Sequence, residues 1–244
     1  MTTLLIDGDI CAYQYSSASE HEVDWGEDVW TLWSDRKEAS NLITQYVDHL
    51  LEATEADKVV FAFTDKENFR KKINPNYKVN RKKIRKPVCY KALVKWITDN
   101  YETYVRPELE ADDVLGILST HPTLIKGRKI VVSEDKDLMT IPGLLWKSGE
   151  LHEIGEEVAD YNFLKQTLTG DATDGYSGVP GIGAVTADKI LTKECSWQVV
   201  LNCFAKANLD ENEALLQARM ARILRASDYD FKNKQIKLWS PNVL

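Results

Sequence analysis

The sequence predicts an α/β protein with a mostly parallel central sheet, followed by a helical lobe. Apolar runs at residues 2–9, 58–65 and 129–134 have the length and composition of buried strands. Helical apolar spacing separates them, and strands that alternate with helices form largely parallel sheets with helices on both faces. From residue 156 to residue 226 the pattern is helical throughout, which indicates a second structural unit.

Each element has its own signal. The first strand ends on Asp7-Gly8-Asp9, and a helix with apolar residues at helical spacing is expected over 36–55. The strand at 58–65 again ends on an acid, Asp65, and Asp135-Lys136-Asp137 follows the strand at 129–134. The remaining expected elements are helices at 88–100, 110–119, 156–168, 184–193, 196–206 and 211–226, strands at 103–106 and 144–147, and a last strand at 235–239 that returns to the sheet.

The composition bounds the class of protein. A chain of 244 residues can bury a large core. No apolar run approaches the ~20 residues of a membrane span, and no signal-peptide pattern opens the chain. The four cysteines are scattered without a CxxC pair, and the four histidines form no zinc-binding pattern. These features are typical of a soluble, cytoplasmic protein with reduced thiols and no membrane partner.

The charge is segregated along the chain. The net charge is −7, yet Lys66 to Lys95 contain twelve Lys/Arg residues and one acid, Glu67. The remainder holds 19 bases and 37 acids, a balance of −18. We call residues 66–95 the basic arm. Charge runs are often merely solvated, but this one follows the Asp65 strand end, and its basic side chains alternate with Phe69 and Tyr77. It can therefore bind phosphates by charge and bases by stacking.

The acids are expected to form one site. Ligands of open parallel sheets bind beyond the carboxyl ends of the strands, where Asp7, Asp65 and the Asp135/Asp137 pair fall. Glu110, Asp112 and Asp113 enter from a helix start, and Asp171 and Asp174 from a later loop; any single member could be only a helix cap or a turn former. So many carboxylates on one rim repel each other unless cations neutralise them, and oxygen ligands select Mg²⁺ or Mn²⁺. Such a cluster suits two ions and phosphodiester hydrolysis.

The stretch TGDATDGYSGVPGIG, residues 169–183, contains a candidate phosphate-binding hairpin. Gly178 to Gly183 read as a tight glycine-proline hairpin before a helix, whose free N–H groups can hold a phosphate oxygen. Alone, the glycines could be a simple turn between helices. The segment is not an EF-hand, because Tyr176 and Ile182 occupy the positions that require Gly and Glu when counted from Asp171.

These residues together resemble the structure-specific 5′-nuclease family, which includes flap endonucleases and the 5′–3′ exonuclease domains of bacterial DNA polymerase I. The likeness is strongest to the small 5′–3′ exonucleases of podovirus-type bacteriophages. The matching stretches cover most of the chain in the family's order: LIDGD (5–9), VFAFTD (60–65), NYKVNR (76–81), ELEADD (108–113), SEDKD (133–137), GDATDGYSGVPGIG (170–183) and MARILR (220–225).

The resemblance implies a PIN-like core over 1–155 that includes the basic arm, and a helix–hairpin–helix (helix-3-turn-helix) lobe over 156–244 that returns to the core. It assigns Asp7, Asp65, Glu110 and Asp112 to a first metal. Asp112 or Asp113, with Asp135, Asp137 and Asp174, would lead to the second, and Asp171 would lie nearby. Lys78 and Arg81 match catalytic positions at the scissile phosphate. DNA binding falls to Tyr77, Lys78, Arg81, Lys82 and Lys83, and to Gly178, Gly181, Ile182 and Gly183.

The implied function is a Mg²⁺-dependent 5′–3′ exonuclease acting on duplex DNA in phage replication, primer removal or nucleotide recycling, in the host cytoplasm. Flap cleavage, RNase H-type activity and a K⁺ ion at the hairpin belong to the same expectation, as do a monomeric state and replication-protein partners. A PIN-type ribonuclease and a non-catalytic DNA-binding accessory protein are the alternatives. Pro75 and Pro87 argue against one long helix in the basic arm, and Trp25, Trp30 and Trp33 are expected to pack rather than to stack on bases.

Overall fold

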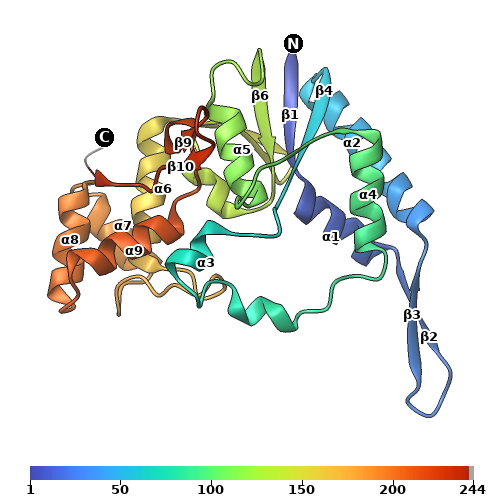
Figure 1. Cartoon of the computed structure of the whole chain (residues 1–244), viewed down its shortest axis with the longest axis horizontal. Helices are drawn as coiled ribbons and strands as arrows, with labels where there is room; N and C mark the ends of the chain where they lie inside the picture. The colour runs from blue at the N-terminus through green and yellow to red at the C-terminus, as the bar shows by residue number, and fades with distance from the viewer. Residues whose placement is uncertain (242–244) are drawn as a thin grey trace.

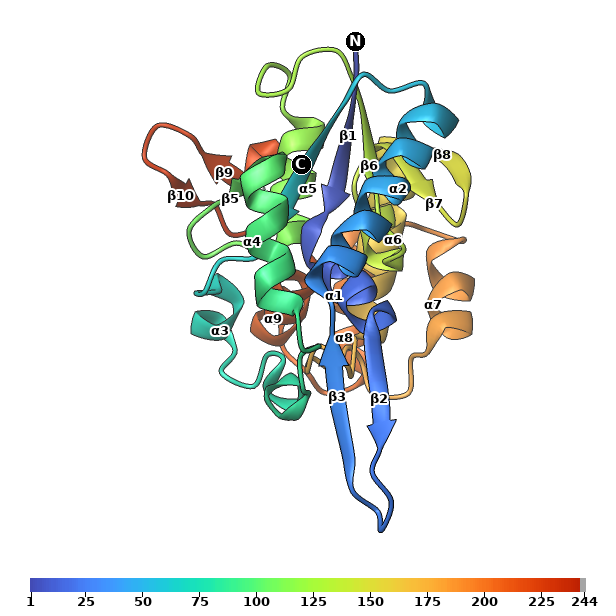
Figure 2. The same ribbon diagram turned by 90° about the vertical axis from the view of Figure 1, so that its right-hand side faces the viewer.

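The computed structural model describes residues 1–241, apart from the side chains of Lys82 and Lys83. A six-stranded sheet forms its centre (Figures 1 and 2). All neighbouring strands are parallel except the last pair, which is antiparallel. In spatial order the strands are β5 (Glu102–Val105), β4 (Lys58–Phe63), β1 (Thr2–Asp7), β6 (Arg128–Val132), β7 (Gly143–Lys147) and β8 (Glu150–Ile154). The predicted α/β class is confirmed, and β8 is a strand that the sequence analysis did not expect.

Helices cover both faces of the sheet. Alternate side chains of β1 face opposite ways, so Leu4 and Ile6 pack into one core and Leu5 into the other. The first core is closed by α1 (Gly8–Ala18), α2 (Arg36–Thr54) and α4 (Tyr90–Asn100), and the second by α5 (Ala111–Thr120) with part of α6 (Glu156–Thr169). Burying one Leu or Ile side chain completely stabilises the fold by about 1.5–3 kcal/mol. Packing on both faces therefore holds β1, and with it Asp7 at its carboxyl end, in a fixed position.

The C-terminal helices surround a third core around Phe204, Phe163 and Leu168. They are the end of α6, then α7 (Ala184–Leu191), α8 (Trp197–Lys206) and α9 (Glu211–Ala221). The last helix ends at Ala221 and not at residue 226 as expected. Tertiary contacts override helical spacing there, because Arg222 bonds Asp228 and the N–H of Leu224 donates to the carboxylate of Asp113.

The expected return of residues 235–239 to the main sheet is wrong. After the short 3₁₀ turn η3 (Ala226–Asp228), β9 (Tyr229–Asp230) pairs only with β10 (Gln235–Ile236) among the described strands. The Asp230 carboxylate accepts the N–H groups of Lys232 and Asn233 and so closes a local turn. Trp239 then packs between Phe163 and Trp197 in the helical lobe, with ring centroids 5.0 and 4.9 Å away.

The Trp-rich segment forms a separate hairpin of β2 (Glu20–Asp24) and β3 (Trp30–Ser34). It extends away from the body in both views (Figures 1 and 2). Trp25, Trp30 and Trp33 are 68, 56 and 51% exposed, so the expectation that they pack into the core or the lobe is wrong. The strands pair with each other, and the described core clusters contain none of these indoles.

The basic arm contains no long helix, as Pro75 and Pro87 predicted. Its described backbone forms α3 (Phe69–Ile73), the 3₁₀ turn η1 (Val79–Lys83) and the beginning of α4. In Figure 1 the arm runs from α3 along the lower edge of the molecule to α4. A further 3₁₀ turn, η2 (Lys136–Thr140), follows β6.

None of the helices within residues 1–241 combines the length and apolarity needed to cross a bilayer.

Candidate active site

Most of the predicted acids meet in one cleft of ≈ 360 Å³ at the carboxyl end of β1. The start of α5, the start of η2 and the loop before α7 supply its other walls. The predicted residues that line it are Asp7, Glu110, Asp112, Asp135, Asp137, Asp171, Asp174, Lys78 and Arg81. The parallel sheet therefore brings together side chains that lie up to 167 positions apart, between Asp7 and Asp174.

One side of the cleft carries acids without a cationic partner, which we call the unpaired carboxylates: Asp7, Asp112, Asp135 and Asp137. The described side chains form no salt bridge with them, and Asp112 Oδ1 is buried with no hydrogen-bond partner. Burial raises the pKa of Asp7 to about 7, and the charges of Asp9 and Asp135 add to this. Burial and the neighbouring Asp7 and Asp135 raise the pKa of Asp112 well above its usual value. Burial and Asp135 raise the pKa of Asp137 to about 6.

This donor set fits divalent cations. Carboxylate oxygens are the ligands that Mg²⁺ prefers, and like charges in a partly dry cleft need a positive charge to remain ionised. In the described part of the chain no three acids already enclose a single point as a finished metal site would. The orphaned oxygen of Asp112 is the feature that a metal ion would satisfy.

On the other side of the cleft, basic side chains form ion pairs with two acids, Glu110 and Asp174, which we call the paired carboxylates. Lys78 Nζ lies 2.6 Å from Glu110 Oε1 and 3.4 Å from Asp174 Oδ2. Arg81 Nη2 lies 2.5 Å from Asp174 Oδ1. Burial disfavours the Glu110 anion, but Lys78 and Arg70 outweigh it and hold its pKa at about 2. For Asp174 burial wins over Lys78 and Arg81, and the pKa is raised.

Backbone contacts hold Lys78 at this position. Its φ of 53° places it in the left-handed region before η1, and its N–H donates to the carbonyl of Asp174 at 2.9 Å. Gly175 lies against the same stretch, where a Cβ would come within 2.7 Å of the Asn76 carbonyl. The loop at 171–178 therefore docks on the basic arm through a close approach that only glycine allows.

Asp113 does not reach the cleft, so its assignment as a metal residue is not supported. Its carboxylate is fully buried and bonds Arg70 at both oxygens, at 2.7 and 2.8 Å. Arg70 also donates to the carbonyls of Met220 and Arg222. The neighbouring helix positions point to different sides, so Asp112 faces the cleft while Asp113 faces the C-terminal segment.

Asp65 is also turned away from the cleft. Successive residues after β4 point to opposite sides, so Thr64 lines the cleft in its place. The carboxylate of Asp65 accepts the N–H of Glu108 at 2.8 Å, and this bond lowers its pKa. The acid therefore closes the turn before α5.

Asp9, to which the sequence pattern assigned no metal role, lies in the cleft instead. Its Oδ2 accepts the N–H of Thr64 at 2.9 Å, and its Oδ1 accepts the hydroxyl of Tyr90 at 2.9 Å. The sequence signal was available, because Asp9 follows Asp7 at the start of the first helix of the chain.

The aromatic residues of the basic arm cannot stack on bases as expected. Tyr77 and Phe69 are 2 and 5% exposed. The hydroxyl of Tyr77 donates to Glu110 Oε2 at 2.7 Å, so this side chain orients a carboxylate. Arg81 is exposed, while the side chains of Lys82 and Lys83 lie outside the described residues.

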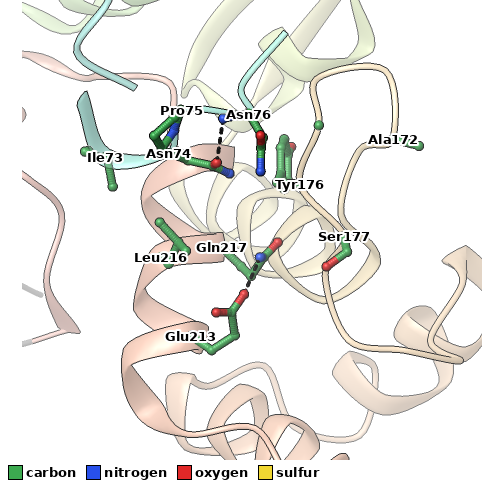
Figure 3. A pocket seen from close by; sticks show the side chains of 11 residues that line it. Ile73, Asn74, Pro75, Asn76, Ala172, Tyr176, Ser177, Glu213, Leu216 and Gln217 are labelled. Atoms are coloured by element: carbon green, nitrogen blue, oxygen red, sulfur yellow. Dashed lines mark hydrogen bonds between the residues drawn. The ribbon is translucent and has the colours of Figure 1, made fainter. Parts of the chain in front are cut away.

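The two ends of the glycine hairpin differ: Gly178 is bonded within the fold, whereas the end at Gly181 to Gly183, which we call the open end, is unobstructed. Gly178 has φ +62°, and its N–H donates to Gln217 Oε1 at 2.8 Å, so it is not free for a phosphate. Gln217 in turn donates to Glu213, beside a pocket of ≈ 570 Å³ next to the arm residues Asn74 to Asn76 (Figure 3).

The open end comprises Gly181 to Gly183. Space around Gly181 and Gly183 is unobstructed, and α7 begins at Ala184 without a side-chain cap. The N–H of Ile182 is used internally, since it donates to Val179. The start of α7 therefore retains the free N–H groups on which the predicted phosphate contact depends.

The chain is similar to known nucleases over nearly its whole length. Residues 2–147 match the 5′-3′ exonuclease N-terminal resolvase-like domain. The chain is 34% identical to an exonuclease of Escherichia phage T7, over 98% of this chain and 93% of the relative. It is 35% identical to an exodeoxyribonuclease of Enterobacteria phage T3, over 98% and 92% of the two chains. A flap endonuclease Xni of Shewanella denitrificans is 29% identical over 65% of this chain and 69% of its own.

Solved structures agree on the fold. A T5 protein crystallised with metal ions superimposes with a TM-score of 0.70 at 14% identity, over 91% of this chain and 89% of the other. The match at this identity concerns the fold alone. Family membership decides against the non-catalytic alternative. The chain belongs to the 5′-3′ exonuclease family, and it is an enzyme of the exonuclease and flap endonuclease type.

Proposed function

We propose that this enzyme hydrolyses phosphodiester bonds near the 5′ ends of duplex DNA, with two divalent cations, Mg²⁺ or Mn²⁺, in the cleft. The unpaired carboxylates carry the proposal, because these clustered acids need cations to remain ionised and share one cleft with Lys78 and Arg81. Other observations support it. A T5 relative of the same fold was crystallised with DNA and metal ions, at a TM-score of 0.65.

The cations would be held by Asp7, Glu110, Asp112, Asp135, Asp137 and Asp174, with Asp171 at the margin. When bound, they would activate water and stabilise the charge that develops on the phosphate. Asp9 holds the N–H of Thr64 and the hydroxyl of Tyr90 at one side of the cleft, and Tyr77 holds Glu110 at the other.

Lys78 and Arg81 supply positive charge where the scissile phosphate would enter. In the free protein Lys78 forms an ion pair with Glu110, and Arg81 forms an ion pair with Asp174. A phosphodiester brought between them can share these donors, and a charge-assisted bond from Arg or Lys is stronger than a neutral one. This arrangement positions the phosphate and stabilises the charge of the transition state.

The two parts of the chain would have different roles. Residues 1–155, with the basic arm, would form the nuclease core, and residues 156–244 the lobe that holds duplex backbone at the open end of the glycine hairpin. A K⁺ ion at this hairpin is part of the proposal. Blunt, recessed, nicked and flapped ends, and RNA–DNA hybrids at primers, are the candidate substrates.

Digestion of 5′-labelled blunt, recessed, nicked and flapped duplexes, together with an RNA–DNA hybrid and single-stranded RNA, tests this function. We expect short labelled products in Mg²⁺ or Mn²⁺ and none in EDTA. Release from the 3′ end first, or unchanged cleavage in EDTA, would contradict it. Cleavage of single-stranded RNA alone would favour the PIN-type ribonuclease.

A further inference from the structure

The β2–β3 hairpin has no part in the function proposed above, and it has two different faces. The register places His21 opposite Trp33 and Val23 opposite Thr31. Trp25 lies on the same side, since its indole N–H donates to Thr31 Oγ1 at 2.8 Å. This aromatic face, made of His21, Val23, Trp25, Thr31 and Trp33, contains no Asp, Glu, Lys or Arg.

The opposite face is acidic. Glu20, Glu22 and Asp24 lie across from Ser34, Leu32 and Trp30. Residues 20–34 contain five acids and no lysine or arginine. The hairpin therefore offers phosphates no lysine or arginine, and on its aromatic face the one titratable side chain, His21, already bonds the Glu38 carboxylate of α2 at 2.9 Å.

The aromatic face is open to solvent. The rings of His21 and Trp33 stack with centroids 4.7 Å apart, which covers one side of the indole and still leaves Trp33 51% exposed. Trp25 is 68% exposed at the end of the hairpin. Exposed apolar patches of this kind mark binding surfaces, because burying an indole releases much of its unfavourable hydration.

The hairpin also lies on the side of the molecule where DNA would enter. Both views show it continuing beyond the carboxyl end of β1, the end at which the cleft lies (Figures 1 and 2). Its base is joined to the basic arm: Glu20 accepts both guanidinium N–H groups of Arg85 at 2.7 Å and the N–H of Val88 at 2.6 Å. These bonds come from the acidic face and fix the base of the hairpin to the basic arm, which holds the aromatic face near the proposed DNA-binding surface.

We propose that the aromatic face is a stacking platform for unpaired DNA bases next to the duplex held in the cleft. This inference rests on the proposed function. Unpaired bases present open π faces, whereas bases inside a duplex are already stacked. Because the hairpin has no cation to displace counterions, its contribution to affinity is insensitive to salt, unlike that of the basic arm.

The test compares Trp25→Ala and Trp33→Ala with Trp30→Ala, a matched control of the same residue type that is 56% exposed on the acidic face. Binding is measured in EDTA to a duplex with a 5′ or 3′ single-stranded tail of about ten nucleotides. The same duplex with an abasic tail keeps the phosphates and removes the bases.

We expect Trp25→Ala and Trp33→Ala each to weaken binding of one base-containing tail roughly tenfold, as loss of one stacked base would. This loss is the same at low and moderate salt and disappears on the abasic tail, while Trp30→Ala stays within about twofold.

An equal loss in Trp30→Ala, a loss that persists on the abasic tail, or no loss in any variant would overturn the platform. So would a wild-type dimer in sedimentation that Trp25→Ala and Trp33→Ala convert to monomer, since a second copy would then cover the face. Hydrolysis of the blunt duplex in Mg²⁺ is measured on the same preparations. Its absence would refute the proposed function, whereas normal hydrolysis with unchanged tail binding refutes only the platform.

Discussion

The two sides of the cleft hold the same kind of residue in opposite electrostatic states. Among the unpaired carboxylates, Asp7, Asp112 and Asp137 have raised pKa values because burial and the charges of neighbouring carboxylates disfavour their ionised forms. Glu110, on the other side, has its pKa lowered to about 2 by Lys78 and Arg70. The chain's own cations therefore neutralise Glu110, while the unpaired carboxylates need cations from solution. Four experiments test this difference between the two sides of the cleft.

The largest effect should come from removing unpaired carboxylates. Asp135→Ala combined with Asp137→Ala should lower hydrolysis by roughly 10³-fold or more, because several kcal/mol of cation-mediated stabilisation is lost. DNA binding in Ca²⁺ should change little. Single-turnover kinetics and a binding titration measure the two, with the exposed Asp99→Ala as a control. Retained cleavage would remove these residues from the metal site.

A smaller effect is expected on the paired side. Lys78→Ala should lower turnover about 10²-fold, because it removes a preorganised charge at the phosphate and leaves Glu110 less well neutralised. Lys86→Ala should stay within about threefold, since Lys86 is exposed and lies over the ring of Tyr90. Steady-state rates under saturating DNA measure the difference. Equal, small losses would reduce Lys78 to general electrostatic attraction.

The metal-free protein should lose stability as the pH rises. The folded pKa of Asp7 is about 7, above the ordinary value of 3.8. Its favourable contribution is therefore complete below about pH 4 and is lost as the pH rises through about 7. A loss on the order of a few kcal/mol lowers Tm by roughly 5–10 °C between pH 5 and pH 8 in EDTA.

Calorimetry of the wild type and Asp7→Asn measures this effect, and the variant should lose much of the pH dependence. Mg²⁺ should raise Tm more at pH 8 than at pH 6, where protons compete for the same oxygens. A pH-independent Tm in EDTA would show that the unpaired carboxylates do not repel each other in the folded protein.

Asp65→Asn should have the smallest effect. Because this carboxylate accepts the N–H of Glu108 outside the cleft, hydrolysis should stay within about threefold of the wild type. A loss as large as that of the Asp135/Asp137 double variant would restore Asp65 to the metal site and show that the turn before α5 rearranges. Rates at saturating Mg²⁺ distinguish the two outcomes.

The sequence was sufficient for five of the six strands of the sheet and for most of the cleft. Strand ends and a shared sheet edge predict that Asp7 and Asp135 converge, because the carboxyl ends of parallel strands meet, and the expected helix start adds Asp112. It could not separate Asp112 from Asp113, or Thr64 from Asp65. Adjacent residues differ only in the direction of their side chains, and this depends on where the helix or strand ends to within one residue.

Other errors have their own physical causes. Tyr77 was expected at the surface because its neighbours in the sequence are basic. Its hydroxyl instead donates to buried Glu110, which lies 33 positions away in the sequence, and no local pattern predicts such a contact. Trp25, Trp30 and Trp33 were expected to pack into the core or the lobe, because indole side chains are highly buried on average. The alternation of acids and aromatics in this hairpin was visible in the sequence, and a two-residue period is typical of a strand.

Arg70 has a consequence for how the enzyme is made. It bonds Glu110 and Asp113 on one side and the carbonyls of Met220 and Arg222 on the other, across 150 and 152 positions of the chain. Closing so long a loop is entropically costly and belongs to the late stages of folding. On the ribosome, residues 7 to 174 emerge before the partner carbonyls exist. The basic arm therefore acquires its final anchor only when synthesis is nearly finished, and a chain truncated before residue 220 lacks it.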